Sequence, residues 1–439
     1  MPTSRLERLA RIGWLTGEFA MGGADEGVRR IFGRADAEAN AFLSTANAER
    51  LARRLARMRG AAMKVGQMIS LMDDELLPRE FADALAILRD AADTMPEAQV
   101  RRVLAREYGR SWRAKFRDFD FEPIAAASIG QVHAATSAEG ASLALKIQYP
   151  GIAESIDSDV DNLAAAFRAA RILPFDLDTG PIIAEAKAQL RQEADYSSEA
   201  RFLARYREHI AGDPRFALPE VDGALTTRHI LAMTRLTGLP LEDVAGADHV
   251  QERRDETARR LLELMFRELF EFGLMQTDPN FSNYLLLSDR STIGLLDFGS
   301  TRDLPPSLTV RYARLLGAVR DSDRPGIRGA AHEIGFLRED DPRGRSDRFV
   351  DLVQVVFEPL AHAGPYDFGA SNLIARAREI GLELAFQHGY LRAPPAETMF
   401  LHRKLDGTMM LCARIRARVD VREIFDTVLG RVGGALDAR

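Results

Sequence analysis

The chain has 439 residues, of which 46% are hydrophobic and 28% are charged, and its formal net charge is −6. This length is sufficient for two or three packed units of a globular protein. The negative charge gives no basic field for nucleic acid, so we expect no nucleic-acid partner. The one cysteine, Cys412, excludes a disulfide framework and a zinc site built from cysteines, and we expect it in the core. The sequence has no apolar stretch as long as a membrane span and no apolar core of a signal peptide, so we expect a cytoplasmic protein.

Residues 1–110 have a helical pattern and predict an N-terminal helical extension. The basic amphipathic segment Arg5–Ile12 could lie on a membrane surface, although such a segment is more often a solvated helix with one packed face. A later helical run carries Lys64-Val65-Gly66-Gln67. Lys64 and Gln67 are three residues apart and therefore share one face of that helix.

Lysine is rare in this chain, since only five of the 59 basic residues are lysine: Lys64, Lys115, Lys146, Lys187 and Lys404. A compact ammonium group that contacts phosphate is not replaced by a planar guanidinium without cost. Lys64 and Lys146 lie in recognisable motifs, whereas Lys115 and Lys187 are expected to have no special role.

Strand patterns begin after residue 110 and predict a β-rich lobe over residues 111–235. Its first strands meet at a turn around Glu139-Gly140, and the second of them, Ser142–Ile147, carries Lys146 near its end. The segment before them takes the place of a glycine-rich phosphate loop, with Ala125, Ala127 and Gly130 at the three glycine positions. Because alanine disfavours positive φ, this loop should be stiffer than one made of glycines.

Lys146 is expected to contact nucleotide phosphates and to pair with an acidic residue of the helical run Ile182–Glu208. The candidates within that run are Glu185, Glu193, Asp195 and Glu199. Strands at Leu218–Val221 and His229–Met233 should close the lobe, and Met233 should line the nucleotide site beside a hinge at Thr234–Gly238.

Two acidic motifs flank a predicted hairpin in the helical region 236–439. The first motif is Gln276-Thr277-Asp278-Pro279-Asn280-Phe281-Ser282-Asn283, and the second is Asp297-Phe298-Gly299. Each motif alone is also ordinary turn or strand-end chemistry. Together and in this order they favour phosphoryl transfer, with Asp278 orienting a hydroxyl or water and Asn283 and Asp297 holding Mg²⁺ against the phosphates of ATP. The rest of this region has no further catalytic constellation. His402-Arg403-Lys404 could touch substrate, although packing or surface charge is the more usual role for such residues on a helix.

The combined motifs resemble the UbiB/ADCK family of atypical kinases over about residues 40–410. The resemblance rests on Lys64-x-Gly66-Gln67, on Ala125-Ala126-Ala127-Ser128-Ile129-Gly130-Gln131-Val132, on Lys146, on Glu193-x-Asp195, and on the two acidic motifs. The Met275–Asn283 segment is most similar to the mitochondrial-type branch, which supports coenzyme Q biosynthesis. The implied fold is α+β, a bilobal protein-kinase-like fold with a small β-rich N-lobe, a helical C-lobe and a family-specific N-terminal helical extension.

The resemblance also implies roles for single residues. Lys64 and Gln67 would face the nucleotide pocket, and Glu193, Asp195 or Glu199 would anchor them. Residues that would bind nucleotide are Ala125, Ala126, Ala127, Ser128, Gly130, Val132, Lys146, Glu193 and Met233. The implied activity is hydrolysis of Mg-ATP, coupled to lipid-like or phenolic quinone precursors and to other quinone-biosynthesis proteins at the inner face of a membrane, with peripheral contact.

Two other classes of function remain open on the sequence alone. One is a true kinase acting on a protein or small molecule, which the Lys64-x-Gly66-Gln67 motif disfavours because it would cover the acceptor site. The other is a nucleotide-binding scaffold, which the complete set of metal and phosphate ligands disfavours.

Overall fold

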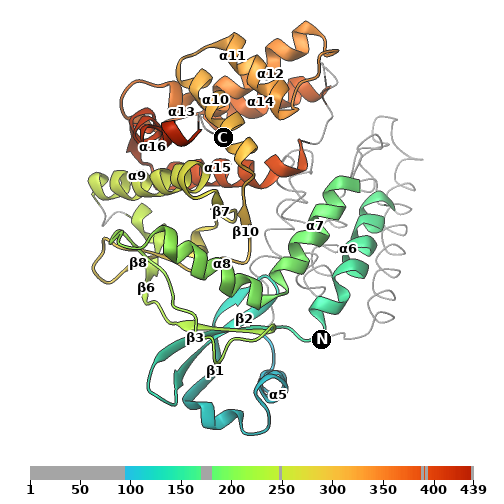
Figure 1. The fold of residues 1–439 in the computed structure, drawn as a ribbon, viewed down its shortest axis with the longest axis vertical. Coiled ribbons are helices and arrows are strands. Elements are labelled where there is room, and N and C mark those ends of the chain that lie inside the picture. The colour runs from blue at the N-terminus through green and yellow to red at the C-terminus, as the bar shows by residue number, and fades with distance from the viewer. Residues whose placement is uncertain (1–93, 170–179, 247–249, 387–389, 391–393, 437–439) are drawn as a thin grey trace, which may run out of the picture. The chain divides into compact units, whose positions relative to one another are not determined.

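The computed structural model describes residues 94–169, 180–246, 250–386, 390 and 394–436 (Figure 1). The chain divides into two compact units. The first unit consists of Met1–Arg201 and Pro219–Arg235, and the second consists of Phe202–Leu218 and Leu236–Arg439. Lys64, Gln67 and the basic segment Arg5–Ile12 lie outside the described residues.

The first unit contains a four-stranded antiparallel sheet in the order β1-β2-β3-β5. Its strands are β1 (Phe116–Ala127), β2 (Gly130–Ser137), β3 (Ser142–Gln148) and β5 (Ile230–Thr234). The predicted turn between β2 and β3 is present, and Gly140 adopts a φ of 97° there, which glycine tolerates readily. Six consecutive residues of β3, from Leu143 to Gln148, are buried, so this strand lies in the middle of the unit's core.

Helices α5 (Glu97–Tyr108), α6 (Ile152–Ala169), α7 (Gly180–Glu193) and α8 (Tyr196–His209) complete the first unit, with α8 continuing into the second. The prediction of one helix over Ile182–Glu208 was wrong, because the chain breaks between α7 and α8. Asp195 lies at this break, where its carboxylate accepts a 3.0 Å hydrogen bond from the backbone N–H of Ser197. Aspartate before a first helical turn is a favoured N-cap, so Asp195 starts a new helix.

The second unit is mainly helical, as predicted. Its main helices are α9 (Gln251–Arg267), α10 (Pro306–Arg320), α11 (Arg324–Ile334), α12 (Arg343–Val356), α13 (Glu358–Ala361), α14 (Leu373–Phe386), α15 (Ala396–Arg414) and α16 (Val421–Leu436). Shorter helical turns are η2 (Leu241–Ala245), the π-helical turn η3 (Glu268–Phe272) and η4 (Phe281–Asn283). One large core joins these helices, and Cys412 is fully buried in it, as expected.

Short strands of the second unit position the acidic motifs. A four-stranded sheet has the order β4-β9-β8-β6, and two-stranded pairs are formed by β10 with β7 and by β11 with β12. Their bounds are β4 (Phe216–Ala217), β6 (Gly238–Pro240), β7 (Leu274–Gln276), β8 (Tyr284–Leu287), β9 (Ile293–Leu295), β10 (Thr301–Asp303), β11 (Tyr366–Asp367) and β12 (Arg418–Val419). The hairpin predicted between the acidic motifs is therefore present as β8 and β9. The strand predicted at Leu218–Val221 is wrong, since β4 ends at Ala217 and only Val221 forms an isolated bridge, with Met233.

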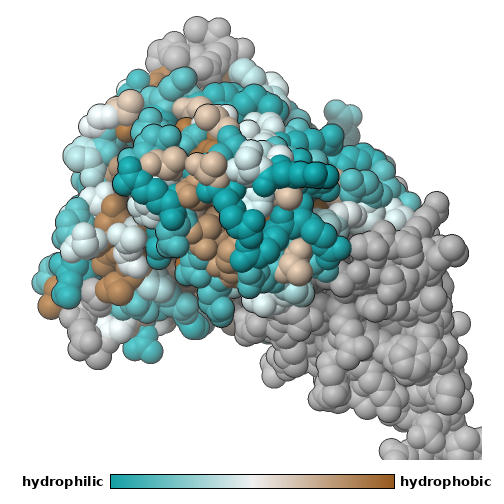
Figure 2. All heavy atoms as spheres, turned by 90° about the horizontal axis from the view of Figure 1, so that it is seen from below, coloured by the Kyte–Doolittle hydropathy of each residue, from teal (hydrophilic) through white to brown (hydrophobic). Residues whose placement is uncertain are grey.

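Few large apolar side chains are exposed among the described residues. Figure 2 shows one face of the molecule, on which hydrophilic side chains separate smaller apolar areas. The exposed large apolar residues of the described chain lie on or beside different elements: Ile124, Leu239, Val250, Ile374 and Met410. Within the ranges that the structure describes, no helix is both long and apolar enough to cross a membrane.

Candidate functional site

The first unit contains a buried lysine–glutamate pair. Lys146 on β3 donates to both carboxylate oxygens of Glu199 on α8, each at 3.0 Å, and both side chains are buried. The ring of Tyr196, one turn earlier on α8, lies 5.4 Å from the Lys146 ammonium. A lysine from the third strand paired with a helical glutamate is the arrangement that kinases use to hold nucleotide phosphates. The structure therefore selects Glu199 from the acidic candidates for the Lys146 partner.

Glu193 has different neighbours. It accepts hydrogen bonds from the hydroxyl of Ser128 and from the side-chain amide of Gln189, both at 3.0 Å. Close by, the side-chain amide of Gln148 donates to the carbonyl of Ala194 at 2.9 Å. Because Ser128 lies between β1 and β2, its bond to Glu193 fastens that hairpin tip to the end of α7.

The predicted alanine loop is a tight hairpin in the structure. Ala125, Ala126 and Ala127 belong to β1 and pair with Val132, Gln131 and Gly130 of β2, so only Ser128 and Ile129 form the turn. A Cβ atom on residue 130 would lie 2.4 Å from the carbonyl oxygen of Ile147, which is too close for any side chain. Glycine is thus required at 130 by packing against β3, whereas alanine is accommodated before the turn. Met233 is buried on β5, opposite Ala144 of β3.

The second unit gathers the acidic motifs at one end of its short strands. The backbone N–H of Leu296, the residue before Asp297, donates to the carbonyl of Asn283 at 3.0 Å. The side-chain amide of Gln276 donates to the carbonyl of Asp278 at 2.9 Å and to that of Asp297 at 3.2 Å. These bonds bring the backbones of the two motifs together, although the residues are far apart in sequence.

Asn283 and Asp297 have a donor chemistry that suits magnesium. The amide nitrogen of Asn283 donates to the carbonyl of Asp278 at 2.8 Å. This bond fixes the orientation of the side chain, and its Oδ1 is the kind of oxygen that a hard cation prefers. In the described chain, no cluster of three His, Cys, Asp or Glu side chains could hold a metal. A kinase-type magnesium site needs fewer protein ligands, because phosphate and water oxygens supply the others.

Helix α15 provides a contact to Asp278 that the sequence analysis missed. Arg403 forms an ion pair with Asp278, with 2.5 Å between Nη2 and Oδ1, and its side chain is nearly buried. Gly407 lies one turn later on the same face of α15. A Cβ atom on residue 407 would lie 2.1 Å from Cγ of Pro279, so glycine there allows the helix to approach the Asp278-Pro279 loop.

The next residue on α15, Lys404, belongs to a buried polar network. Its ammonium lies 2.9 Å from Glu268 and 3.4 Å from the side-chain oxygen of Gln276. Glu268 also accepts from the hydroxyl of Tyr206 at 2.8 Å and from the backbone N–H of Gln276 at 3.0 Å. Burial alone would lower the pKa of Lys404, but the charge of Glu268 raises it overall, so Lys404 carries its charge. This network holds Gln276, which in turn bonds both acidic motifs.

The role predicted for His402-Arg403-Lys404 was therefore incomplete. His402 does pack in the core, where its Nε2 lies 2.7 Å from the hydroxyl of Tyr312. Arg403 and Lys404, in contrast, contact the strand and loop that carry Asp278. The scarcity of lysine was a signal for Lys404, since a surface position would be expected to carry arginine in this chain.

Comparison with known proteins agrees with this geometry. Residues 87–331, more than half of the chain, match the family described as the ABC1 atypical kinase-like domain. The chain is 37% identical to the mitochondrial atypical kinase COQ8B of Rattus norvegicus over 434 residues, which cover 98% of this chain and 81% of that protein. It is 36% identical to the mitochondrial atypical kinase COQ8 of Saccharomyces cerevisiae over 432 residues, covering 98% and 85% of the two chains. The probable protein kinase UbiB of Marinobacter nauticus is 26% identical over 336 residues, 73% of this chain and 60% of that one.

A solved structure supports the fold. The complex of Rv3197 with erythromycin, from Mycobacterium tuberculosis, superposes with a TM-score of 0.61 and 24% identity, covering 85% of this chain and 93% of that chain. The described residues thus form a kinase-like, mixed α+β fold. The chain belongs to the ABC1 family of atypical kinase-like proteins, which includes COQ8 and UbiB and is involved in coenzyme Q biosynthesis.

Proposed function

We propose that this protein binds Mg-ATP and hydrolyses it in support of coenzyme Q biosynthesis. The observation that carries the proposal is the pairing of Asp278 with Arg403 beside Asn283 and Asp297. We also propose that the chain has three parts, with boundaries at residues 110 and 235. Lys64 and Gln67 of the N-terminal part would face the nucleotide.

The first unit would contribute the nucleotide contacts. Lys146, held by Glu199, presents a point charge suited to α and β phosphates. Ser128 and Glu193 would keep the hairpin tip in place, and the paired alanines leave it less freedom than glycines would. Met233 would line the adenine side.

The second unit would contribute the chemistry. Asp278 orients a water or hydroxyl for in-line attack, and Arg403 fixes the direction of its carboxylate. Asn283 and Asp297 would hold Mg²⁺, which when bound neutralises charge on the phosphates. The Gln276 side chain keeps both motifs at a fixed separation.

Phosphate release and phosphate transfer should be measured together on full-length wild type and Asp278→Asn. We expect wild type to release phosphate from Mg-ATP without labelling protein or an added acceptor, and Asp278→Asn to lose about 100-fold or more of that rate. Asp340→Asn makes the same change at an exposed turn and should leave the rate unchanged. Transfer to an acceptor by wild type would instead establish a kinase, and nucleotide binding without turnover would establish a scaffold.

The same assay tests the link to lipid-like quinone precursors. The relatives named above as mitochondrial atypical kinases motivate a role near a membrane. Adding anionic liposomes and a small phenol should raise the wild-type rate. No response to either would remove the support for a peripheral membrane site and for phenolic precursors as ligands.

A further inference from the structure

A pocket lined by charged side chains lies in the second unit. It has a volume of about 480 Å³. Three segments line it, namely the loop 211–215 after α8, one side of α9, and α16. None of its lining residues belongs to the Asp278, Asn283 and Asp297 site.

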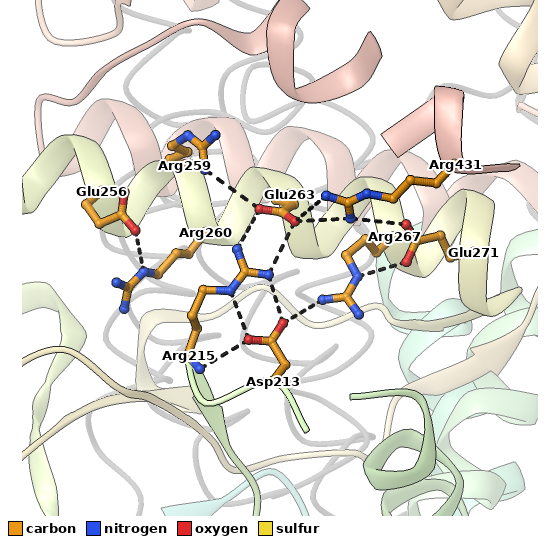
Figure 3. Close-up of polar contacts among 9 residues, drawn as sticks. All are labelled: Asp213, Arg215, Glu256, Arg259, Arg260, Glu263, Arg267, Glu271 and Arg431. Carbon is orange, nitrogen blue, oxygen red and sulfur yellow. Dashed lines mark hydrogen bonds and ion pairs between the residues drawn. The ribbon is translucent and has the colours of Figure 1, made fainter. Parts of the chain in front are cut away.

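Arginine side chains converge on this pocket (Figure 3). Arg215 is clamped by Asp213 and Glu263, with contacts of 2.8 and 2.7 Å. Arg267 is held in the same way by Asp213 at 2.8 Å and by Glu271 at 2.9 Å. These distances are typical of charge-assisted hydrogen bonds, so the inner guanidinium groups are fixed in place.

The inner carboxylates remain ionised at neutral pH. The hydrogen bonds from Arg215 hold the pKa of Asp213 well below its ordinary value, although burial opposes this. Burial alone would raise the pKa of Glu263, but the hydrogen bond and charge of Arg215 lower it overall. The inner surface of the pocket, here called its floor, is therefore formed by the ion-paired side chains of Arg215 and Arg267 and their carboxylates, and it is charged rather than apolar.

Two further arginines at the rim are held far less tightly. Arg259 is 44% exposed and lies 3.9 Å from Glu263. Arg431 is 48% exposed, and its ion-pair contacts to Glu263 and Glu271 are both 3.4 Å. These distances exceed those of good charge-assisted hydrogen bonds, so the rim arginines retain donors that an incoming acceptor could engage.

The charge balance favours an anion. The four arginines (Arg215, Arg259, Arg267 and Arg431) meet three carboxylates (Asp213, Glu263 and Glu271), which leaves one net positive charge. Guanidinium groups recognise planar pairs of phosphate oxygens through two parallel donors. The volume is in the range of small-molecule sites and exceeds what one inorganic phosphate would fill.

We propose that this pocket is a binding site for a phosphate ester, gripped by Arg259 and Arg431 over a floor built by Arg215 and Arg267. A phosphorylated small molecule and a phospholipid headgroup share this chemistry. The lining has only three apolar side chains, those of Ala211, Pro214 and Ile424, so an acyl chain would find little surface there.

Calorimetric titration of the full-length protein with fructose 1,6-bisphosphate tests whether the pocket binds a phosphorylated small molecule. We expect one-site binding in wild type and a loss of affinity of at least tenfold in Arg259→Gln/Arg431→Gln, because the variant loses two charged hydrogen-bond donors to the phosphate groups. The matched control is Arg314→Gln/Arg422→Gln. It removes two ion-paired arginines from the same unit, one of them on α16, and should bind like wild type.

The direction of the affinity change on removal of a carboxylate separates a binding site from a purely structural cluster. Glu271→Gln removes a carboxylate that faces Arg267 and Arg431, so it should tighten binding of the bisphosphate by about threefold. A structural cluster gives no gain of affinity on losing a carboxylate. Equal affinity in wild type and Arg259→Gln/Arg431→Gln would place the bisphosphate elsewhere and exclude a soluble phosphate ester as the ligand of this pocket.

Sedimentation with phosphatidylcholine vesicles that contain or lack phosphatidic acid tests whether the pocket binds a phospholipid headgroup. Binding that needs phosphatidic acid and is lost in Arg259→Gln/Arg431→Gln would assign the pocket to a lipid headgroup. Loss of only the bisphosphate titration in that variant would assign it to a soluble phosphate ester. If neither probe depends on these two arginines, the proposal is wrong.

Discussion

Neighbouring residues on α15 secure the candidate catalytic loop at two points. Arg403 holds the side chain of Asp278, while Lys404 and Glu268 hold Gln276, which bonds the backbones of both acidic motifs. The first contact holds the proposed catalytic carboxylate itself, and the second is a fully buried pair behind it. Their removal should consequently affect different properties, turnover in one case and stability in the other.

Arg403→Gln should reduce the turnover number for phosphate release by about 10- to 100-fold, because a misdirected catalytic group costs about that much. Nucleotide affinity should change little, since Arg403 contacts Asp278 and not the proposed phosphate ligands. Arg403→Lys should recover part of the rate. Arg414→Gln, at the exposed end of the same helix, is the control and should behave like wild type. An unchanged turnover number in Arg403→Gln would show that Asp278 needs no help in orientation.

Lys404→Met should lower the free energy of unfolding by about 3–5 kcal/mol, because it leaves the buried carboxylate of Glu268 without its cation. Lys404→Met/Glu268→Leu should regain part of this loss. Lys187→Met breaks a pair in which Asp161 is exposed and should cost no more than about 1 kcal/mol. Urea unfolding of the variants measures all three. Equal costs for Lys404→Met and Lys187→Met would mean that the buried pair does not stabilise the loop.

For single residues, the sequence showed which side chains were candidates for the site, but not which side chains they contact. The scarcity of lysine and its strand position pointed to Lys146, and the structure pairs it with a helical glutamate. The choice among Glu185, Glu193, Asp195 and Glu199 depends on where the helix breaks, and Asp195 as an N-cap inside a helical pattern was overlooked. The Arg403 contact depends on how α15 packs, which no local pattern encodes.

Two glycines allow close contacts between elements at the candidate site. Gly130 lets β2 lie against β3, and Gly407 lets α15 lie against Pro279. The hairpin of β8 and β9 was predicted correctly, because its turn and apolar runs are local signals. The alanine segment was predicted as a loop but is paired strand, because cross-strand pairing overrides the appearance of a small-residue run.

Gly407→Ala should lower both stability and the rate of phosphate release, since its methyl group would meet Pro279 and push α15 away from Asp278. Overpacking of this kind typically costs about 1–3 kcal/mol. The contrasting variant is Gly381→Ala on α14, where nothing lies near the added methyl. It should be neutral or stabilise by up to about 1 kcal/mol through helix propensity. Thermal unfolding and phosphate release measure both effects, and identical behaviour of the two variants would contradict the close approach of α15.

For the whole molecule, the order of the motifs along the chain was sufficient to predict a kinase-like α+β fold. A strand that carries a lysine, a helix that carries a glutamate, and two acidic motifs follow one another as they do in kinases. Family membership is consistent with that order. The arginine-lined pocket was not predicted, since Arg215, Arg259 and Arg431 come from three distant segments with no shared motif. Because arginine is common throughout this chain, these arginines do not stand out in the sequence.

The most direct test of the central claim is a nucleotide titration with and without Mg²⁺, carried out together with a turnover assay on wild type, Asp278→Asn and Asp297→Asn. The account predicts that Asp278→Asn binds nucleotide like wild type, with the same dependence on Mg²⁺, but turns over about 100-fold or more slowly. Asp297→Asn should lose the effect of Mg²⁺ on binding. Normal turnover in Asp278→Asn, or an unchanged magnesium dependence in Asp297→Asn, would contradict the proposed division between chemistry and metal binding.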